Sequence, residues 1–152
     1  MNTIGFRTLA FRGIGGAGAI ALMIWLSKVF AIPLMWIPFS TSIVMVMGSP
    51  EAPPAQPKRV LGGHLICAAS GLACTMILGS DVWIAALAVG LAIMVMLWLD
   101  VFHPPAGISP VIIASSHATP LYMLTPVLAG VAILLAYAFL FHRVTGTKWP
   151  QA

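Results

Sequence analysis

Charged residues are what this sequence has least of. Lysine, arginine, aspartate and glutamate make up 7% of its 152 residues, and only three residues are acidic. A soluble domain carries about 25% charged residues, so a soluble fold is excluded. The longest polar stretch, Ser49 to Arg59, is too short to form a separate soluble module. Since 61% of the residues are hydrophobic, we expect one all-α, polytopic membrane domain over residues 1–152.

The small number of cysteines, histidines and acids also limits the possible chemistry. Cys67 and Cys74 lie on one apolar helix, where they are more typical of packing residues than of a disulfide or a metal pair. No two of the four histidines are spaced i, i+4, and no Ser-His-Asp or paired-carboxylate arrangement is evident. We therefore expect no enzyme activity, no metal and no cofactor. The net charge of +4 lies in tails and loops, where it orients helices rather than indicating nucleic-acid binding.

The N-terminal segment contains a glycine motif that favours helix packing. Gly13 to Gly18 matches G-x-G-x-x-G, but no strand precedes it and it opens an apolar helix, so a nucleotide site is rejected. Small residues let helices approach closely, and they invite contacts between protomers. Arg7 and Arg12 precede the apolar run as in a signal peptide, but no convincing cleavage site follows, so we expect a retained first helix.

Apolar runs of about 20 residues predict the membrane-spanning helices. Two further apolar segments are shorter and rich in proline, serine or glycine. The clear spans are Val60–Leu78, Val82–Leu99 and Leu121–Phe141; Gly13–Ala31 qualifies if Lys28 snorkels; the short segments are Leu34–Met47 and Pro105–Ser116.

A shift of 67 residues relates the two halves of the chain. Pro38–Ala69 and Pro105–Ala136 then share ten identities in 32 positions, although biased composition is an alternative explanation. Each half, about 13–78 and about 82–141, is predicted to contain a long helix, a short broken helix and a long helix. Three crossings per half require the repeats to be inverted, and short interrupted segments at matching positions are typical of a transporter's binding site.

The basic residues favour six crossings. Arg7, Arg12, Lys58, Arg59, Arg143 and Lys148 then share one side, opposite Lys28 and Asp81. This positive-inside pattern predicts that both termini are cytoplasmic, and we expect the inner membrane of a bacterium. If the short segments only re-enter the membrane, Lys58 and Arg59 lie outside and the bias weakens.

The strongest candidate site follows the fourth predicted helix, where the chain reads Asp100-Val101-Phe102-His103-Pro104-Pro105. If the helix continues to Phe102, Asp100 and His103 share a face and can carry a proton as a pair. An ionisable residue inside a membrane segment is a functional candidate. The alternative is that His103 only caps the end of a helix.

Two helix starts are the second candidate. Pro38-Phe39-Ser40-Thr41-Ser42 and Pro105-Ala106-Gly107-Ile108-Ser109 each open a short segment. Unpaired N–H groups at a helix start, beside hydroxyls or glycine, form a plausible seat for an anion. Ordinary N-capping by Ser40 or Thr41 is the alternative.

The stretch from Gln56 to Leu65 is the third candidate, with Lys58 and Arg59 at the interface and His64 about one turn inside the membrane. Gly63, Cys67, Gly71 and Cys74 follow on one helical face and, with Ser70, make a wall of small residues. This wall either lines a cavity that His64 enters or packs tightly against a neighbouring helix.

These motifs resemble those of the HPP family of integral membrane proteins, named for the triplet that stands here as His103-Pro104-Pro105. The resemblance covers about Leu34 to Ala136. Chloroplast and cyanobacterial members are linked to nitrite transport, so the resemblance implies a transporter or channel for a small inorganic anion. We expect nitrite, proton linkage and a homo-oligomer, either a dimer or a trimer. A non-transporting scaffold or assembly subunit is the alternative.

Overall fold

The computed structural model describes residues 5–32, 34 and 37–151, and this part of the chain is helical without strands. The predicted all-α membrane fold is confirmed. The α-helices are α1 (Phe6–Phe30), α2 (Ile37–Gly48), α3 (Pro57–Leu78), α4 (Val82–Trp98), α5 (Ser109–Ser116) and α6 (Ala129–Thr145). Short helical turns join them: η1 (Pro53–Ala55), η2 (Pro104–Ile108), η3 (Pro120–Met123) and η4 (Leu124–Leu128).

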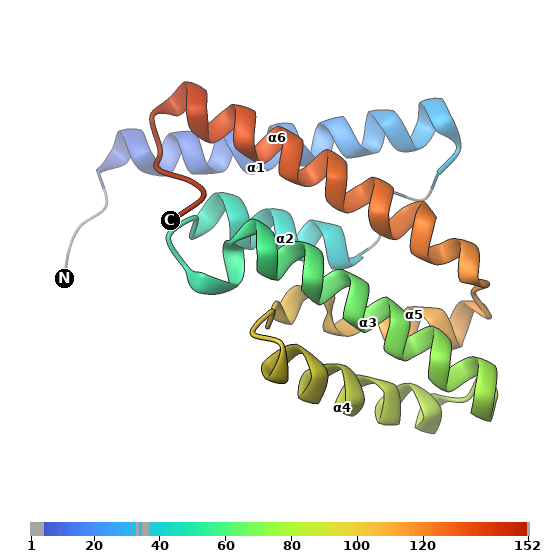
Figure 1. Ribbon diagram of the computed structural model, residues 1–152. Coiled ribbons are helices and arrows are strands. Elements are labelled where there is room, and N and C mark those ends of the chain that lie inside the picture. Colours follow the sequence, from blue (N-terminus) through green and yellow to red (C-terminus); the bar gives the residue numbers. More distant parts are fainter. Residues whose placement is uncertain (1–4, 33, 35–36, 152) are drawn as a thin grey trace.

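The helices lie roughly side by side and alternate in direction along the chain (Figure 1). Helices α1 and α6 form one side, α4 and α5 form the other, and α2 and α3 lie between them. Alternating directions agree with six crossings. The inverted relation of the two halves stays a prediction.

Helix lengths refine the predicted spans. Helix α1, helix α3 and the segment Pro120–Thr145 are long and apolar enough to cross a membrane, whereas α4 has 17 residues and is among the shorter apolar helices. At 1.5 Å per residue α4 is about 26 Å long, and the 12 residues of α2 are about 18 Å long. Helix α1 begins at Phe6, seven residues before the predicted start, because no helix breaker separates its two arginines from the apolar run.

The last predicted span is interrupted, contrary to the expectation of one helix over Leu121–Phe141. Thr125 has φ −134° and ψ 120°, which is extended rather than helical backbone. Pro126 follows it, and a proline disfavours helical backbone in the residue before it. The regular helix α6 therefore begins only at Ala129.

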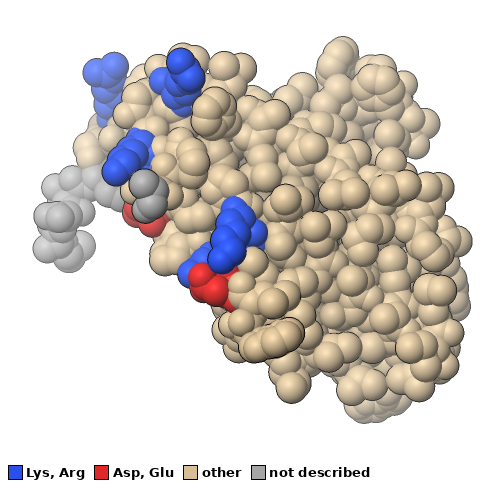
Figure 2. All heavy atoms as spheres, in the orientation of Figure 1, with Lys and Arg blue, Asp and Glu red and all other residues tan. Residues whose placement is uncertain are grey.

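Charged side chains gather at one end of the molecule, beside the start of α1 and the end of α6 (Figure 2). Glu51 pairs there with Arg12 at 3.0 Å, and Asp100 pairs with Arg59 at 2.6 Å. The third acid, Asp81, caps the start of α4 by accepting from the Trp83 backbone N–H at 2.8 Å. The clustering of basic residues at one end agrees with the predicted positive-inside pattern.

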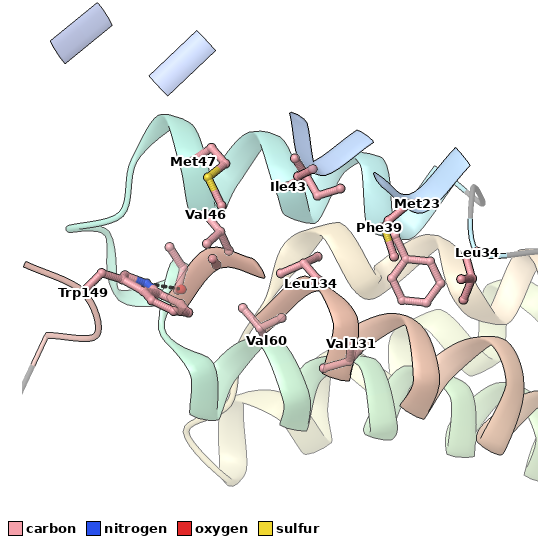
Figure 3. Close-up of a cluster of buried hydrophobic side chains, with 13 residues drawn as sticks. Met23, Leu34, Phe39, Ile43, Val46, Met47, Val60, Val131, Leu134 and Trp149 are labelled. Atoms are coloured by element: carbon pink, nitrogen blue, oxygen red, sulfur yellow. Dashed lines mark hydrogen bonds between the residues drawn. The ribbon is translucent and has the colours of Figure 1, made fainter. Parts of the chain in front are cut away.

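Helix α3 is the central helix, and it packs on α4, α5, η2 and the start of the last span. The largest apolar core lies among α1, α2, α6 and the first turn of α3 (Figure 3). It contains Met23, Leu34, Phe39, Ile43, Val46, Met47, Val60, Val131, Leu134 and Trp149 among others.

The glycine motif of α1 packs within the chain. A Cβ on Gly15 would lie 2.6 Å from the Phe141 ring, and one on Gly18 would clash with the Tyr137 hydroxyl. Both partners belong to α6, so this part of the motif is buried against the same protomer. Gly13 and Gly16 have open space beside them.

Candidate functional site

Three polar side chains meet inside the apolar helices: Ser42 of α2, His64 of α3 and His103, which precedes η2. We call them the histidine–serine cluster, and all three are fully buried at 0% exposure. The Ser42 hydroxyl lies 2.9 Å from His64 Nε2 and 2.8 Å from His103 Nε2. The two imidazole rings lie 5.3 Å apart between centroids. The cluster thus joins residues 22 and 61 positions apart in the sequence.

A chain reversal after α4 brings His103 into this position. Asp100 has φ 53°, in the left-handed region, and ends the helical turn. His103 itself has extended backbone before the two prolines that open η2. The reversal turns the chain back along α3, where Gly63 makes room for it. A Cβ on Gly63 would lie 2.5 Å from His103 Cβ and 3.3 Å from the Val101 carbonyl oxygen.

The hydrogen bonds of the cluster have a defined order. His103 Nδ1 lies 2.7 Å from the Pro54 carbonyl oxygen, which only accepts, so Nδ1 carries a hydrogen. In a neutral ring, Nε2 then accepts from the Ser42 hydroxyl, and His64 Nε2–H donates to Ser42 Oγ. When His103 binds a second proton, its Nε2–H donates to Ser42, whose hydrogen turns to the Pro38 carbonyl oxygen at 2.8 Å. The cluster can therefore take up one proton without breaking a contact between heavy atoms.

His64 has one nitrogen without a partner. Its ring stacks on Phe39 with a centroid distance of 5.1 Å and an interplanar angle of 22°. Its Nδ1 has no hydrogen-bond partner among the residues that the structure describes. A buried polar atom without a partner costs free energy. A water, a proton or a ligand that bound this nitrogen would recover that free energy. In the same described residues, histidines, cysteines and acids form no group of three that suits a metal.

Asp100 does not pair with His103, contrary to the sequence interpretation. Its side chain is 67% exposed and pairs with Arg59 and Lys58 at the charged end. The regular helix ends at Trp98, so the three-residue spacing no longer places Asp100 and His103 on one helical face. The acid therefore lies at the surface while the imidazole is buried.

The predicted anion seats are arranged differently from the expectation. Helix α2 begins at Ile37, so the three hydroxyls lie inside its first turns. The Thr41 hydroxyl donates back to the Pro38 carbonyl oxygen at 3.0 Å, and the Ser42 hydroxyl lies 2.8 Å from the same oxygen, to which it donates when His103 is charged. Ser40 is half-buried, and no side-chain cap on it is evident. A short polar side chain that bonds its own helix in this way does not cap the helix start.

The second predicted seat is divided between a groove and a buried contact. Thr41, Pro104 and Pro105 line an open groove of about 640 Å³ between α2 and η2. Ser109 is buried and hydrogen-bonds the Tyr122 side chain, while Gly107 is half-buried in η2. The two helix starts therefore do not form one shared seat, and of the predicted hydroxyls only Ser42 reaches the histidines.

The wall of small residues on α3 is a packing surface. Gly63, Cys67, Ser70, Gly71 and Cys74 are all buried. A Cβ on Gly71 would lie 2.9 Å from Pro110 Cα, and Cys67 Sγ lies 3.7 Å from Met96 Sδ. The interpretation as tight helix packing holds for this face. His64 does not enter a cavity along this wall; its Nε2 bonds the Ser42 hydroxyl.

Sequence reasoning did not identify two partners in the site. The Pro54 carbonyl fixes His103, and the Phe39 ring covers His64. A backbone carbonyl leaves no signal in a side-chain pattern, whereas Phe39 stood within the quoted Pro38–Ser42 motif without a role.

Comparisons with known proteins place the chain in a family. The family model described as HPP, transmembrane region, matches residues 1–150. Two transmembrane proteins of Dictyostelium discoideum are similar: one is 31% and the other 32% identical over 113 residues, or 69% of this chain. The chain spans 40% and 36% of their lengths. No solved structure matches it. The chain thus belongs to the HPP transmembrane family and is an integral membrane protein.

Proposed function

We propose that this HPP-family membrane protein transports a small inorganic anion, with nitrite first and nitrate or another monovalent anion next. The observation that carries the proposal is the histidine–serine cluster itself. Polar groups cost free energy when they are buried among apolar helices, and inside a membrane protein they usually mark a functional pathway. His64 Nδ1, which has no partner within the described residues, becomes a hydrogen-bond donor to an anion when its ring is protonated.

Proton linkage follows from the two hydrogen-bond patterns of the cluster. A proton taken up by His103 places a positive charge beside Ser42 and His64, and that charge favours an anion in the low-dielectric interior. Release of the anion and loss of the proton are then coupled. The Ser42 hydrogen moves between His103 and the Pro38 carbonyl as the proton binds and leaves.

The position of the basic residues supports transport across a bacterial inner membrane with both termini in the cytoplasm. Arg12, Lys58 and Arg59 lie at the end where both α1 begins and α6 ends. Basic residues in short loops are retained on the cytoplasmic side.

Uptake by proteoliposomes tests this function. Purified protein is reconstituted, and nitrite uptake is measured with an inward proton gradient, with a voltage and with neither. We expect uptake faster than in empty liposomes, a further increase with acid outside, and loss of both in Ser42→Ala. Ser115→Ala is the matched control, because Ser115 is exposed and, among the described residues, bonds only the Ile112 carbonyl of its own helix. Uptake no faster than in empty liposomes under all three conditions refutes the proposal.

A non-transporting scaffold is the second candidate, and the closed interior favours it. All three side chains of the cluster are fully buried, and a scaffold needs no open path. If the protein is a scaffold, Ser42→Ala destabilises it, but neither the parent nor the variant takes up nitrite. A partner protein then co-purifies in fixed stoichiometry.

A homo-oligomer, dimer or trimer, suits either function. Helix α2, at about 18 Å, is much shorter than the roughly 30 Å hydrocarbon core, yet its Thr41 and Val44 side chains are exposed in the groove beside η2. Protein rather than lipid satisfies polar groups at such a place. Mass measurement in mild detergent tests this, and an active monodisperse monomer contradicts it.

A further inference from the structure

A polar pocket separate from the histidine–serine cluster lies at the charged end of the molecule, between the start of α1 and the end of α6. It encloses about 130 Å³, and none of its lining residues belongs to the histidine–serine cluster. Ligand pockets for drug-sized molecules hold about 300–1,000 Å³, so this space suits only a small group. The residues that line it are Arg7, Thr8, Phe11, Arg12, Pro50, Phe141, His142, Thr145 and Thr147.

The pocket carries net positive charge. Arg12 is held in place by Glu51 at 3.0 Å and by the Gly48 carbonyl, which together use only part of its five N–H donors. Arg7 makes no ion pair within the described residues, and its guanidinium lies 5.4 Å from the Phe11 ring centroid. The other two acids of the chain are engaged elsewhere, in ion pairs at α3 and at the cap of α4. One guanidinium charge is therefore uncompensated at this site.

His142 supplies a second, independent sign of a missing ligand. The residue is 2% exposed, and its Nε2 lies 3.2 Å from the Val46 carbonyl oxygen, which accepts the Nε2 hydrogen. Its Nδ1 is buried and has no hydrogen-bond partner in the part of the chain that the structure describes. Buried polar atoms are nearly always satisfied, so an orphan nitrogen on a residue that lines a cationic pocket indicates an absent polar group.

The donors in this pocket match a tetrahedral oxyanion. Arginine guanidinium groups bind phosphate oxygens with two parallel hydrogen bonds. The Thr8 and Thr147 hydroxyls can donate or accept, whereas the Thr145 hydroxyl already donates to the Phe141 carbonyl oxygen at 2.9 Å. His142 Nδ1 can accept from a protonated phosphate oxygen or donate when the ring is charged. The backbone N–H groups at the start of the 25-residue helix α1 add partial positive charge.

We infer that this pocket binds a phosphate group, supplied either by an anionic phospholipid headgroup or by inorganic phosphate. Basic pockets between membrane helices on the cytoplasmic side bind anionic headgroups, which suits a pocket at the charged end. The site does not depend on transport through the histidine–serine cluster.

Binding is tested on the full chain in mild detergent. The probes are dioctanoyl-phosphatidylglycerol, dioctanoyl-phosphatidylcholine and inorganic phosphate, the last against chloride at equal ionic strength. Bound probe is counted by native mass spectrometry, and the unfolding midpoint is followed during each titration. Arg7→Gln is the test variant because Arg7 makes no ion pair with any residue that the structure describes. Arg143→Gln is the matched control, since Arg143 is exposed near the end of α6 and does not line the pocket.

We expect phosphatidylglycerol, inorganic phosphate or both to bind and to raise the unfolding midpoint, with phosphatidylcholine weaker. Arg7→Gln should weaken that binding about tenfold, equivalent to about 1.4 kcal/mol, because it removes a charge-assisted hydrogen bond to the phosphate group. Binding of phosphatidylglycerol alone identifies a lipid headgroup, whereas binding of inorganic phosphate identifies a site that also takes the free ion. The inference is overturned if neither probe binds, or if Arg143→Gln weakens binding as much as Arg7→Gln.

Discussion

Replacing Gly63 with alanine should displace His103 from the histidine–serine cluster. The new Cβ would lie 2.5 Å from His103 Cβ, about 0.9 Å closer than the 3.4 Å at which ordinary contacts begin. The clashing atom is next to the backbone, so the segment that carries His103 must shift rather than a flexible side-chain tip. A shift of that size lengthens the 2.8 Å contact with Ser42 and the 2.7 Å contact with Pro54 beyond hydrogen-bond range.

The expected loss of stability follows from three terms. Overpacking costs about 1–3 kcal/mol, and a buried partner left unsatisfied costs about 1–3 kcal/mol. Alanine regains about 1 kcal/mol of helix propensity over glycine. The net loss is about 3 kcal/mol, which corresponds to a fall of roughly 6–12 °C in the unfolding midpoint for a chain of this size.

Gly90→Ala is the matched control, because Gly90 lies within α4 and a Cβ there meets nothing within 4 Å. Both variants are purified in the same detergent, and the unfolding midpoint and nitrite uptake are measured side by side. We expect Gly90→Ala to match or exceed the parent in stability and to keep its uptake rate, whereas Gly63→Ala loses both. If the midpoints of the two variants agree, the close approach of His103 to α3 is not what the fold requires.

Three further changes test other contacts. Ser42→Ala leaves two buried imidazole nitrogens without their shared partner, so we expect about 1–3 kcal/mol less stability by thermal unfolding, while Ser115→Ala changes it little. Asp100→Asn removes only exposed ion pairs and keeps a residue that tolerates φ 53°. Stability should therefore change by about 1 kcal/mol or less, and the pH dependence of nitrite uptake should match that of the parent. A flattened pH profile would contradict the placement of Asp100 at the surface. Trp149→Phe loses the 3.1 Å bond to the Ala55 carbonyl, and a cost near 1 kcal/mol by thermal unfolding is expected, whereas no change shows that the bond does not hold the tail.

The sequence predicted the membrane class and the two short segments well, because apolar runs and prolines act locally. The apolar helix α4 ends just before the charged residue Asp100. Pro104 and Pro105 open the short helical turn η2, as predicted from a helix break at these prolines. His64 and His103 were both identified, since imidazoles are rare in such a composition. Local signals of this kind depend on a few neighbouring residues and survive without tertiary information.

The arrangement of the site was not predictable in the same way. The prediction for Asp100 assumed that the helix continued to Phe102. Asp100 itself adopts left-handed backbone and reverses the chain there, and no glycine in the sequence signals such a reversal. The pairing of Ser42 with both histidines depends on how α2 packs on α3, which no periodicity in either helix encodes. Long-range packing therefore decided which of the candidate hydroxyls entered the cluster.

The C-terminal tail has a mechanical consequence. Trp149 is buried against the turn before α3 (Figure 3). The Gln151 backbone N–H donates to the Gln56 side chain at 2.8 Å. That turn also holds Pro54, whose carbonyl fixes His103. A domain fused after Gln151 would therefore strain the turn whose Pro54 carbonyl holds His103 in place. An affinity tag or fluorescent protein is best fused at the other end of the chain, because one fused after Gln151 would shift the buried His103 ring.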